Sequence, residues 1–314
     1  MTKIKMSLRL YIFIVGWIFL LRPVSAQSRY YSLADDRSAP VIESWNLTDP
    51  DTIGQSVITL HYEMRYVVDT LSHSVHQNRV VVQTDGNVVK YYVMRRHLQD
   101  RIMTQVEKLL DGTAAVPGVG GQYVKTAEEE EMDRIAGVDD ILNSEIWFCR
   151  DKGILIERMH DYDRQNFAIE YEEPIPKFEW IVGSQQREIC GYQCFSAHAW
   201  FRGRSWTAWF CPEIPVDTGP WKFNGLPGVI LAVTDSSSHY DWECVAVKGQ
   251  EPIIYYRVPK KRIGKEQYAQ YVKNIHTSPL SVLGHGGDVV FYSRASKKWL
   301  DDTWEVPYNP IELE

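Results

Sequence analysis

The feature that most restricts the fold of this chain is a succession of short segments in which apolar and polar residues alternate. Residues 56–68 show the pattern most clearly. Their apolar members fall on one side of an extended chain: Ile58, Leu60, Tyr62, Met64 and Tyr66. Successive side chains of a strand point to opposite faces, so this pattern is typical of a strand with one buried face. From residue 55 onward the sequence predicts one strand after another.

Turn residues between these segments predict hairpins around residues 84–87, 150–153 and 234–239. The apolar period becomes that of a helix in residues 97–110, and residues 265–274 form a second, short helix candidate. We find no βαβ alternation, internal repeat or linker. The predicted fold class is therefore mainly β (α+β), a single curved antiparallel sheet or half-barrel with a few helices, in one domain of residues 27–314.

The first 26 residues have the three-part layout of a cleavable signal peptide. Lys3, Lys5 and Arg9 precede an apolar run at residues 10–21, and the small residue Ala26 marks the expected cleavage site. Twelve helical residues rise about 18 Å, well short of a hydrocarbon core of about 30 Å. An uncleaved anchor is the alternative. We expect an exported protein, periplasmic or secreted.

The charge balance restricts the partners that the protein can bind. Removal of residues 1–26 takes away four basic residues and no acidic one, so the formal charge falls from -7 to -11. An acidic chain of this kind is not expected to bind nucleic acid. No later segment reaches 18 apolar residues, so we expect no stable transmembrane span after cleavage.

The best-defined hairpin turns at Arg202-Gly203. A two-residue turn there places Phe201 opposite Arg204 and, further along the same two strands, Cys194 opposite Cys211. The cysteine pair falls at a position where side chains approach closely. The sequence permits either a disulfide between Cys194 and Cys211 or two free buried thiols.

The same register separates two faces of this hairpin. One face is expected to join the core: Phe195, Ala197, Ala199, Trp206, Ala208 and Phe210. The other face is half polar and could line a groove: Ser196, His198, Trp200, Thr207 and Trp209.

A proline-glycine elbow follows the hairpin at Gly225-Leu226-Pro227-Gly228. Proline fixes its φ near -65° and glycine accepts a positive φ, so Pro227-Gly228 predicts a type II turn that leads into a strand at residues 229–233. Gly225 allows a close approach of the backbone. The elbow by itself only turns the chain.

These residues resemble the signature of the GLPGLI family, exported proteins known chiefly from Bacteroidetes. The named segment reads Gly225-Leu226-Pro227-Gly228-Val229-Ile230 here, with one Val in place of Leu. The resemblance extends to the following segments: Gly191-Tyr192-Gln193-Cys194, Phe201-Arg202-Gly203-Arg204, Ala208-Trp209, Glu213-Ile214-Pro215, Gly219-Pro220 and Tyr308-Asn309-Pro310-Ile311-Glu312-Leu313-Glu314. The core of the match covers roughly residues 180–247.

The resemblance implies export and a β-rich fold, and it implies no established activity. By analogy, the succession of strands is similar to the half-barrels of lipoprotein carriers, in which a curved antiparallel sheet wraps helices. Cys190 and Cys211 depart from the family pattern, so the resemblance implies no shared thiol site.

No motif in the sequence implies a metal, a cofactor or an activated nucleophile. If Cys190 and Cys194 share one strand, they lie about 13 Å apart at 3.3 Å per residue, too far for one zinc ion unless a turn or bulge intervenes. His198 has no nucleophile in a recognised context, so a half-buried structural histidine is the simpler interpretation.

Two classes of function therefore stand as hypotheses. The first is a non-enzymatic binding or carrier module for an apolar or peptide ligand, or for another envelope protein. Its expected ligand contacts are Tyr192, Trp200, Trp209, Trp221 and Phe223. The second is a hydrolase with a dispersed active site. A structural accessory of an envelope assembly is a further alternative.

Overall fold

The structure is a computed structural model that describes residues 51–70, 74–94, 144–160, 168–255, 260–277 and 308–313. The predicted signal peptide and the predicted helix at residues 97–110 lie outside these described ranges. No helix within these ranges is both long enough and apolar enough to span a membrane.

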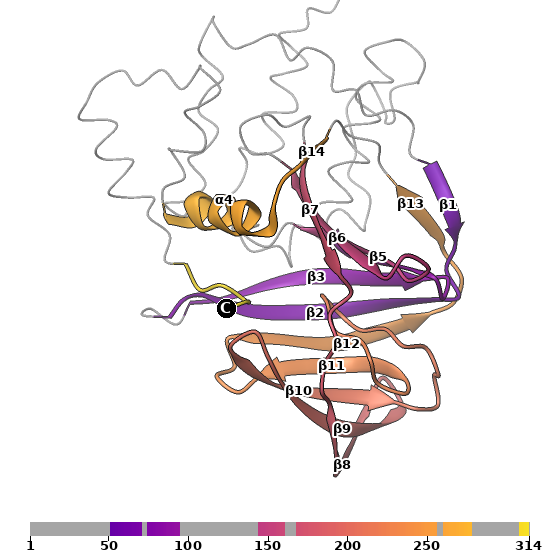
Figure 1. Ribbon diagram of the computed structural model, residues 1–314. Helices are drawn as coiled ribbons and strands as arrows, with labels where there is room; N and C mark the ends of the chain where they lie inside the picture. Colours follow the sequence, from indigo (N-terminus) through magenta and orange to yellow (C-terminus); the bar gives the residue numbers. More distant parts are fainter. Residues whose placement is uncertain are drawn as a thin grey trace, which may run out of the picture.

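Most of the described residues form strands, in a mainly β fold as predicted (Figure 1). The strands are β1 (Asp51–Gln55), β2 (Ile58–Asp69), β3 (Ser74–Thr84), β4 (Val88–Val93), β5 (Glu145–Cys149), β6 (Ile154–His160), β7 (Ala168–Pro174), β8 (Ile181–Ile189), β9 (Tyr192–Phe201), β10 (Arg204–Cys211), β11 (Val229–Asp235), β12 (Tyr240–Lys248), β13 (Pro252–Tyr255) and β14 (Lys260–Arg262). The helix α4 (Lys265–Thr277) follows them in the chain.

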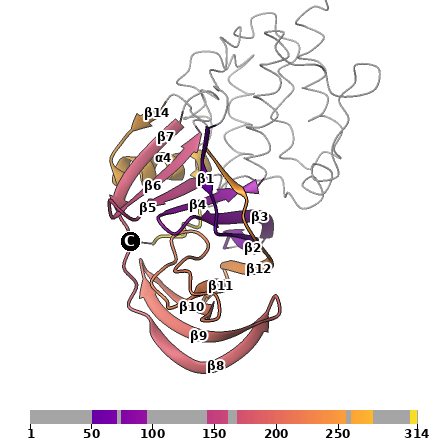
Figure 2. The same cartoon turned by 90° about the vertical axis from the view of Figure 1, so that its right-hand side faces the viewer.

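Twelve of these strands form one curved sheet in the order β14-β7-β6-β5-β4-β3-β2-β12-β11-β10-β9-β8. Neighbouring strands are antiparallel, except that β14 runs parallel to β7. Strands β1 and β13 form a separate antiparallel pair. The sheet bends strongly through β8 and β9 (Figure 2). Because β14 and β8 are its two end strands, the sheet is curved but unclosed, which agrees with the half-barrel prediction.

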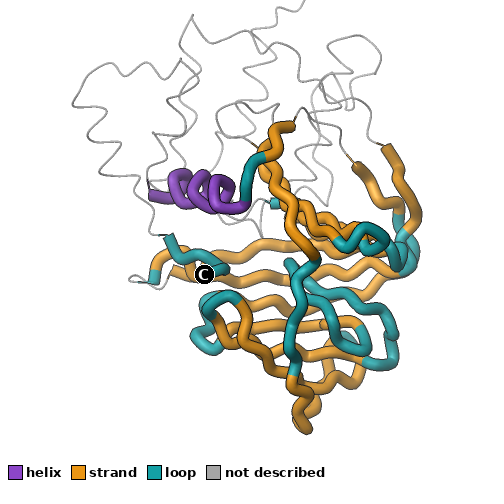
Figure 3. Tube along the Cα trace, in the orientation of Figure 1, coloured by secondary structure: helices purple, strands orange, loops and turns teal. Residues whose placement is uncertain are grey.

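The predicted hairpins and alternating faces are confirmed. β3 pairs with β4, β5 with β6, and β11 with β12, at the turns that the sequence predicts. The apolar face of β2 is buried from Ile58 to Tyr66. The predicted helix at residues 265–274 is α4, which lies beside β7 in Figure 3 and places the Tyr268 ring 4.7 Å from the Tyr171 ring.

The register predicted for the hairpin at Arg202-Gly203 is also confirmed. Arg204 pairs with Phe201, and the pairing continues without a shift to Phe210 and Phe195. All six residues predicted for the core face pack in or against the core. The register set by this one turn therefore decides which face of the β9–β10 hairpin is buried.

One case considered from the sequence, in which Cys190 and Cys194 share a single strand, does not hold in the structure. Residues 188–201 do not form a single strand, because a turn at Cys190-Gly191 separates β8 from β9. Cys190 and Gly191 have φ values of 53° and 80°. Two positive φ angles are what a tight hairpin turn requires, and cysteine is not a residue whose presence signals such a turn. Cys190 and Cys194 consequently lie on the two sides of a turn, and their separation along one strand does not apply.

Candidate functional site

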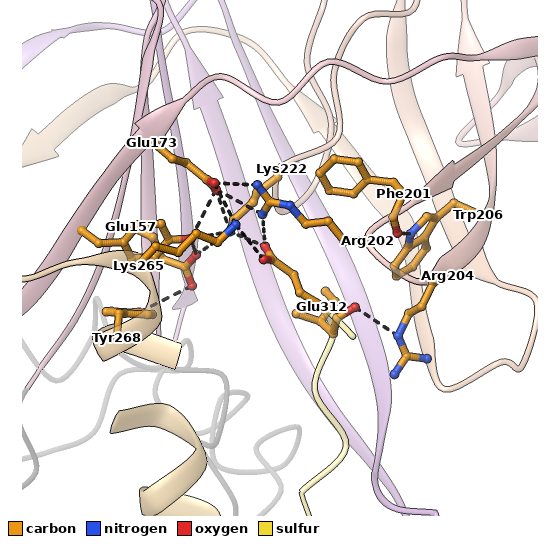
Figure 4. Close-up of polar contacts among 12 residues, drawn as sticks. Glu157, Glu173, Phe201, Arg202, Arg204, Trp206, Lys222, Lys265, Tyr268 and Glu312 are labelled. Carbon is orange, nitrogen blue, oxygen red and sulfur yellow. Dashed lines mark hydrogen bonds and ion pairs between the residues drawn. The ribbon is translucent and has the colours of Figure 1, made fainter. Parts of the chain in front are cut away.

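Two regions of the described structure gather residues from the motifs of the sequence. One is the outer face of β8, β9 and β10, which carries the half-polar side of the hairpin. The other is a charged cluster around the segment 308–313, here called the clasp. Its members are Glu157, Tyr171, Glu173, Arg202, Lys222, Lys265 and Glu312 (Figure 4).

The outer face combines exposed apolar side chains with a histidine and a threonine. Ile181 of β8 pairs with His198 of β9, which in turn pairs with Thr207 of β10. The His198 Nδ1 atom lies 3.1 Å from the Thr207 hydroxyl. Trp200 is 67% exposed and Ile181 is 73% exposed. Exposed large apolar side chains of this kind, brought together on adjacent strands, are typical of contact surfaces.

The strand β8 also has an irregular edge. Its pairing with β9 shifts between Val182 and Gln186, so that three residues of β8 lie opposite Ser196 alone. The space is tight, because a Cβ atom on Gly183 would lie 2.4 Å from the Ser196 hydroxyl. Within the described ranges β8 pairs with β9 and with no strand on its other side. Val182, beside this bulge, is 56% exposed.

Trp209 and Tyr192 are only partly open. The guanidinium of Arg187 lies 4.9 Å from the Trp209 ring centroid, and the same group contacts Glu243 at 3.3 Å. Tyr192 is half-buried and packs against the core. Trp209 and Tyr192 can therefore offer only part of their side chains to a contact surface, whereas most of the Trp200 side chain is exposed.

Trp221 and Phe223, the other two predicted ligand contacts, are placed in the core. They are 5% and 0% exposed. Phe223 packs edge to face against Trp206 at 4.9 Å and against Trp242 at 5.8 Å. The inner side of the sheet is thus filled here by aromatic side chains of the protein itself, and these two rings line no groove. The sequence did not distinguish a ring on the filled side from a ring on the open side.

The elbow at residues 225–228 turns the chain as expected but by another turn. Gly225 and Gly228 have positive φ values of 90° and 156°. A type II turn would be closed by the Val229 amide on the Leu226 carbonyl. Instead the Gly228 amide donates to Leu226, and the Val229 amide donates to Ile214. The predicted type II turn is wrong, because the Val229 amide donates to the Ile214 carbonyl instead of closing the turn on Leu226.

The predicted cysteine pair lies on neighbouring strands, and both thiols are buried and free. Burial, followed by the neighbouring Cys211, raises the pKa of the Cys194 thiol to about 12. Among the residues that the structure describes, no group of three or more His, Cys, Asp or Glu side chains is placed to bind a metal ion.

The clasp is built around the ammonium group of Lys222. Its Nζ atom lies 2.8 Å from Glu157, 3.2 Å from Glu173 and 2.6 Å from Glu312, and it donates to the Tyr171 hydroxyl at 2.6 Å. Lys222 is 1% exposed. A buried ammonium is tolerated only when it is paired and hydrogen-bonded, and these four partners meet that condition.

Two further cations complete the clasp. Arg202 contacts Glu173 at 2.5 Å and also pairs with Glu312. Lys265, at the start of α4, lies 2.9 Å from Glu173 and 3.2 Å from Glu312. Three cations therefore face three carboxylates, a balanced and largely buried network that joins β6, β7, the hairpin turn, α4 and the segment 308–313.

Two carboxylates of the clasp, those of Glu173 and Glu312, are held in their charged form. Burial alone would raise the pKa of Glu173, but the hydrogen bond from Arg202 and the charge of Lys222 outweigh it and lower that pKa to about 2. Burial likewise opposes ionisation of Glu312, and the charges of Lys222 and Arg202 outweigh it and lower the pKa of that carboxyl. The carboxylates of the clasp, Glu157 foremost, raise the pKa of Lys222 against the effect of burial.

Arg204 makes further contacts with the segment 308–313. Its guanidinium donates to Asp235 at 2.8 Å, to the Asn309 side chain at 2.9 Å, and to the carbonyls of Pro310 and Ile311 at 2.6 and 3.0 Å. The planar fork of an arginine suits several acceptors at once. The clasp and Arg204 therefore fasten the segment 308–313 to the sheet, and every strong charge in them is matched by a partner.

The sequence alone indicates no role for Arg202, Arg204, Lys222 or Glu312. Three of them stand in the segments that carry the family resemblance, Phe201-Arg202-Gly203-Arg204 and the one ending Ile311-Glu312-Leu313-Glu314, and Lys222 follows Gly219-Pro220 by two residues. A signal was present in the complementary charges of these segments. It could not be interpreted, because nothing in a linear sequence states that residues 90 positions apart meet.

Comparisons with known proteins match parts of this chain to one family model and to three solved structures. A family model described as a protein of unknown function (Porph_ging) matches residues 202–232, which include Arg202, Arg204, Lys222 and the elbow. The match covers a short part of the chain and does not carry the GLPGLI name. No curated protein matches.

Three solved structures are similar in part. Two are structures of PNGF-II, in space groups P21 and C2, with 12% identity each and TM-scores of 0.43 and 0.44, over 68% and 70% of this chain. The matched regions cover 32% and 33% of those chains, so this chain spans about a third of their length. The third is an uncharacterized conserved protein from Thermus thermophilus, with 7% identity and a TM-score of 0.32, over 66% of this chain and 91% of that one.

Proposed function

We propose that this protein is an exported, non-enzymatic binding module of the GLPGLI family that takes an extended peptide segment of another envelope protein. The segment would add to the free side of β8 and lay apolar side chains on Ile181 and Trp200. The observation that carries the proposal is the coincidence of two features on one edge, an end strand with a bulge and exposed apolar side chains beside it. An extended peptide is the ligand class that uses both, since its main chain pairs with an edge strand and its alternate side chains find apolar contacts.

The filled inner side of the sheet favours a surface ligand over an apolar ligand carried inside. Trp206, Trp221, Phe223 and Trp242 occupy that side with one another. The hydrolase alternative gains no specific support, because His198 is exposed on the outer face of β9 and contacts the hydroxyl of Thr207 on the neighbouring strand β10. The clasp has no unmatched charge to offer a substrate.

The test is selection of peptides from a displayed random library, followed by calorimetry with the selected synthetic peptides. Trp200→Ala and Ile181→Asn should each weaken binding at least tenfold. Val75→Ala is the matched control, since Val75 is 64% exposed but lies on β3, and it should bind as wild type does. Amide exchange at residues 183–186 should slow when the peptide is bound.

Three outcomes would contradict the proposal. The library could yield no peptide, or the selected peptides could bind equally well to Trp200→Ala and Ile181→Asn. Sedimentation could instead show a dimer of this chain that Ile181→Asn dissociates, which would make the edge a self-association surface. Export has its own test, because cleavage after Ala26 would leave Gln27 as the first residue of the mature protein in N-terminal sequencing.

A further inference from the structure

Four of the five cysteines gather where the turn between β8 and β9 meets β12. Cys190 is exposed at the turn, and Cys244 of β12 is 3% exposed. Cys194 and Cys211, both fully buried, lie next to them, since Cys190 and Cys211 each act on the pKa of Cys194. A reagent can therefore reach the thiol of Cys190 but not the thiol of its neighbour Cys244.

Cys190 and Cys244 are in direct contact. The Cys190 thiol donates to the Cys244 carbonyl at 3.0 Å, and the Cys244 thiol donates to the Ala246 carbonyl at 3.4 Å. A second contact beside them joins the same two parts of the sheet: Arg187 of β8 reaches Glu243 of β12 at 3.3 Å. In the sheet order, β11, β10 and β9 separate these two strands. The curl of the sheet therefore brings its end hairpin back onto β12, and the two thiols lie at that junction.

We propose that Cys190 and Cys244 form a reversible disulfide by thiol–disulfide exchange with a small-molecule or protein disulfide. The Cys190 thiolate attacks one sulfur of the reagent and expels the other as a thiolate, which leaves a mixed disulfide on Cys190. The Cys244 thiolate then attacks the Cys190 sulfur and expels the second half of the reagent. The two cysteines lose two protons and two electrons, and the reagent disulfide is reduced to two thiols.

Exposure decides the order of the two steps. Cys190 reacts first because it is the member of the pair that is open to solvent. Burial, and then the neighbouring Cys190 sulfur, raise the pKa of the Cys244 thiol, so little of it is thiolate at neutral pH and the second step is the slower one. Cys194 and Cys211 are both buried, so a reagent does not reach either of them directly. The bond would pin the β8–β9 hairpin to β12, and this inference does not depend on the peptide site.

The test uses the purified full chain and oxidised glutathione, followed by alkylation of the remaining thiols and tryptic mapping under denaturing, non-reducing conditions. Trypsin separates the relevant cysteines well: Cys190 and Cys194 share peptide 188–202, Cys211 lies in 205–222, and Cys244 lies in 223–248. The expected product joins 188–202 to 223–248. It should form in wild type, in Cys194→Ser and in the distant control Cys149→Ser, and it should disappear on reduction.

The variants Cys244→Ser and Cys190→Ser, each of which removes one thiol of the pair, are expected to give different products. Cys244→Ser should accumulate a glutathione adduct on peptide 188–202, because the resolving thiol is absent. Cys190→Ser should give neither the linked peptide nor a rapid adduct, and its exposed position leaves the fold intact, as circular dichroism would check. A link between 188–202 and 205–222 in place of the expected one would overturn the proposal. So would a wild-type protein whose glutathione adduct never resolves, or one that does not react at all.

Discussion

The ammonium group of Lys222 and the carboxylate of Glu312 lie 2.6 Å apart although 90 residues separate them in the chain. This buried pair is the centre of the clasp, and it joins the connection between β10 and β11 to the segment 308–313. The first two predictions below concern the clasp, and the third concerns Arg204, which holds the same segment. Each variant is compared with a change at an exposed counterpart.

Lys222→Met should destabilise the protein by about 3–5 kcal/mol, because it leaves Glu157, Glu173 and Glu312 short of a buried cation. The free energy of unfolding from urea titration measures this. The control is Lys248→Met, which removes an exposed pair with Glu251 at 3.7 Å and should cost less than about 1 kcal/mol. Equal costs for the two variants would contradict a structural role of the clasp.

Stability should fall as the pH drops from about 4.5 toward 2. The pKa of Glu173 is lowered in the folded state to about 2 from an ordinary value of 4.5, so its contribution is fully present above pH 4.5 and is lost as the pH falls through the folded value. Thermal melting between pH 2 and 6 measures the slope. Glu173→Gln should flatten it, whereas Glu179→Gln, an exposed site outside the clasp, should keep it.

Arg204→Lys should release the segment 308–313 while the sheet stays folded. A lysine keeps the charge near Asp235 but lacks the fork that reaches Asn309, Pro310 and Ile311 together. Amide exchange at residues 309–313 should accelerate at least tenfold. Arg65→Lys, at an exposed pair with Asp241, is the matched change and should leave that exchange unaltered. Unchanged exchange in Arg204→Lys would show that other contacts hold the segment.

Gly228→Ala should destabilise the protein by about 1–3 kcal/mol or more, the cost of strain at a sparsely populated backbone conformation with a close contact. An added Cβ would lie 2.1 Å from the Cys211 carbonyl oxygen, and φ at this glycine is 156°. The free energy of unfolding measures the effect. Gly249→Ala is the control, because nothing lies within 4 Å of a Cβ there. A neutral result for Gly228→Ala would mean that the elbow is free to shift away from Cys211.

Local patterns carried much of the fold. The alternation in β2, the turn residues at 84–87 and the two-residue turn at Arg202-Gly203 depend only on neighbours in the chain, so register and buried face followed from them. The turn at Cys190-Gly191 escaped prediction, because Cys190 adopts a positive φ that its residue type does not announce. The sequence predicted a turn at the elbow but not its hydrogen bonds, because the Val229 amide donates to the distant Ile214 carbonyl.

By itself the sequence determined the mainly β class, the register of the hairpin at Arg202-Gly203, the acidic charge and the residues that resemble a known family. Only the tertiary structure decided which aromatic rings are buried, that Cys190 meets Cys244, and that Lys222, Arg202 and Arg204 hold the segment 308–313. The physical reason is the range of the interactions. Side-chain alternation and turn geometry act over a few residues, whereas the curl of the sheet and the pairing of buried charges join residues that are distant in the chain and adjacent only after folding.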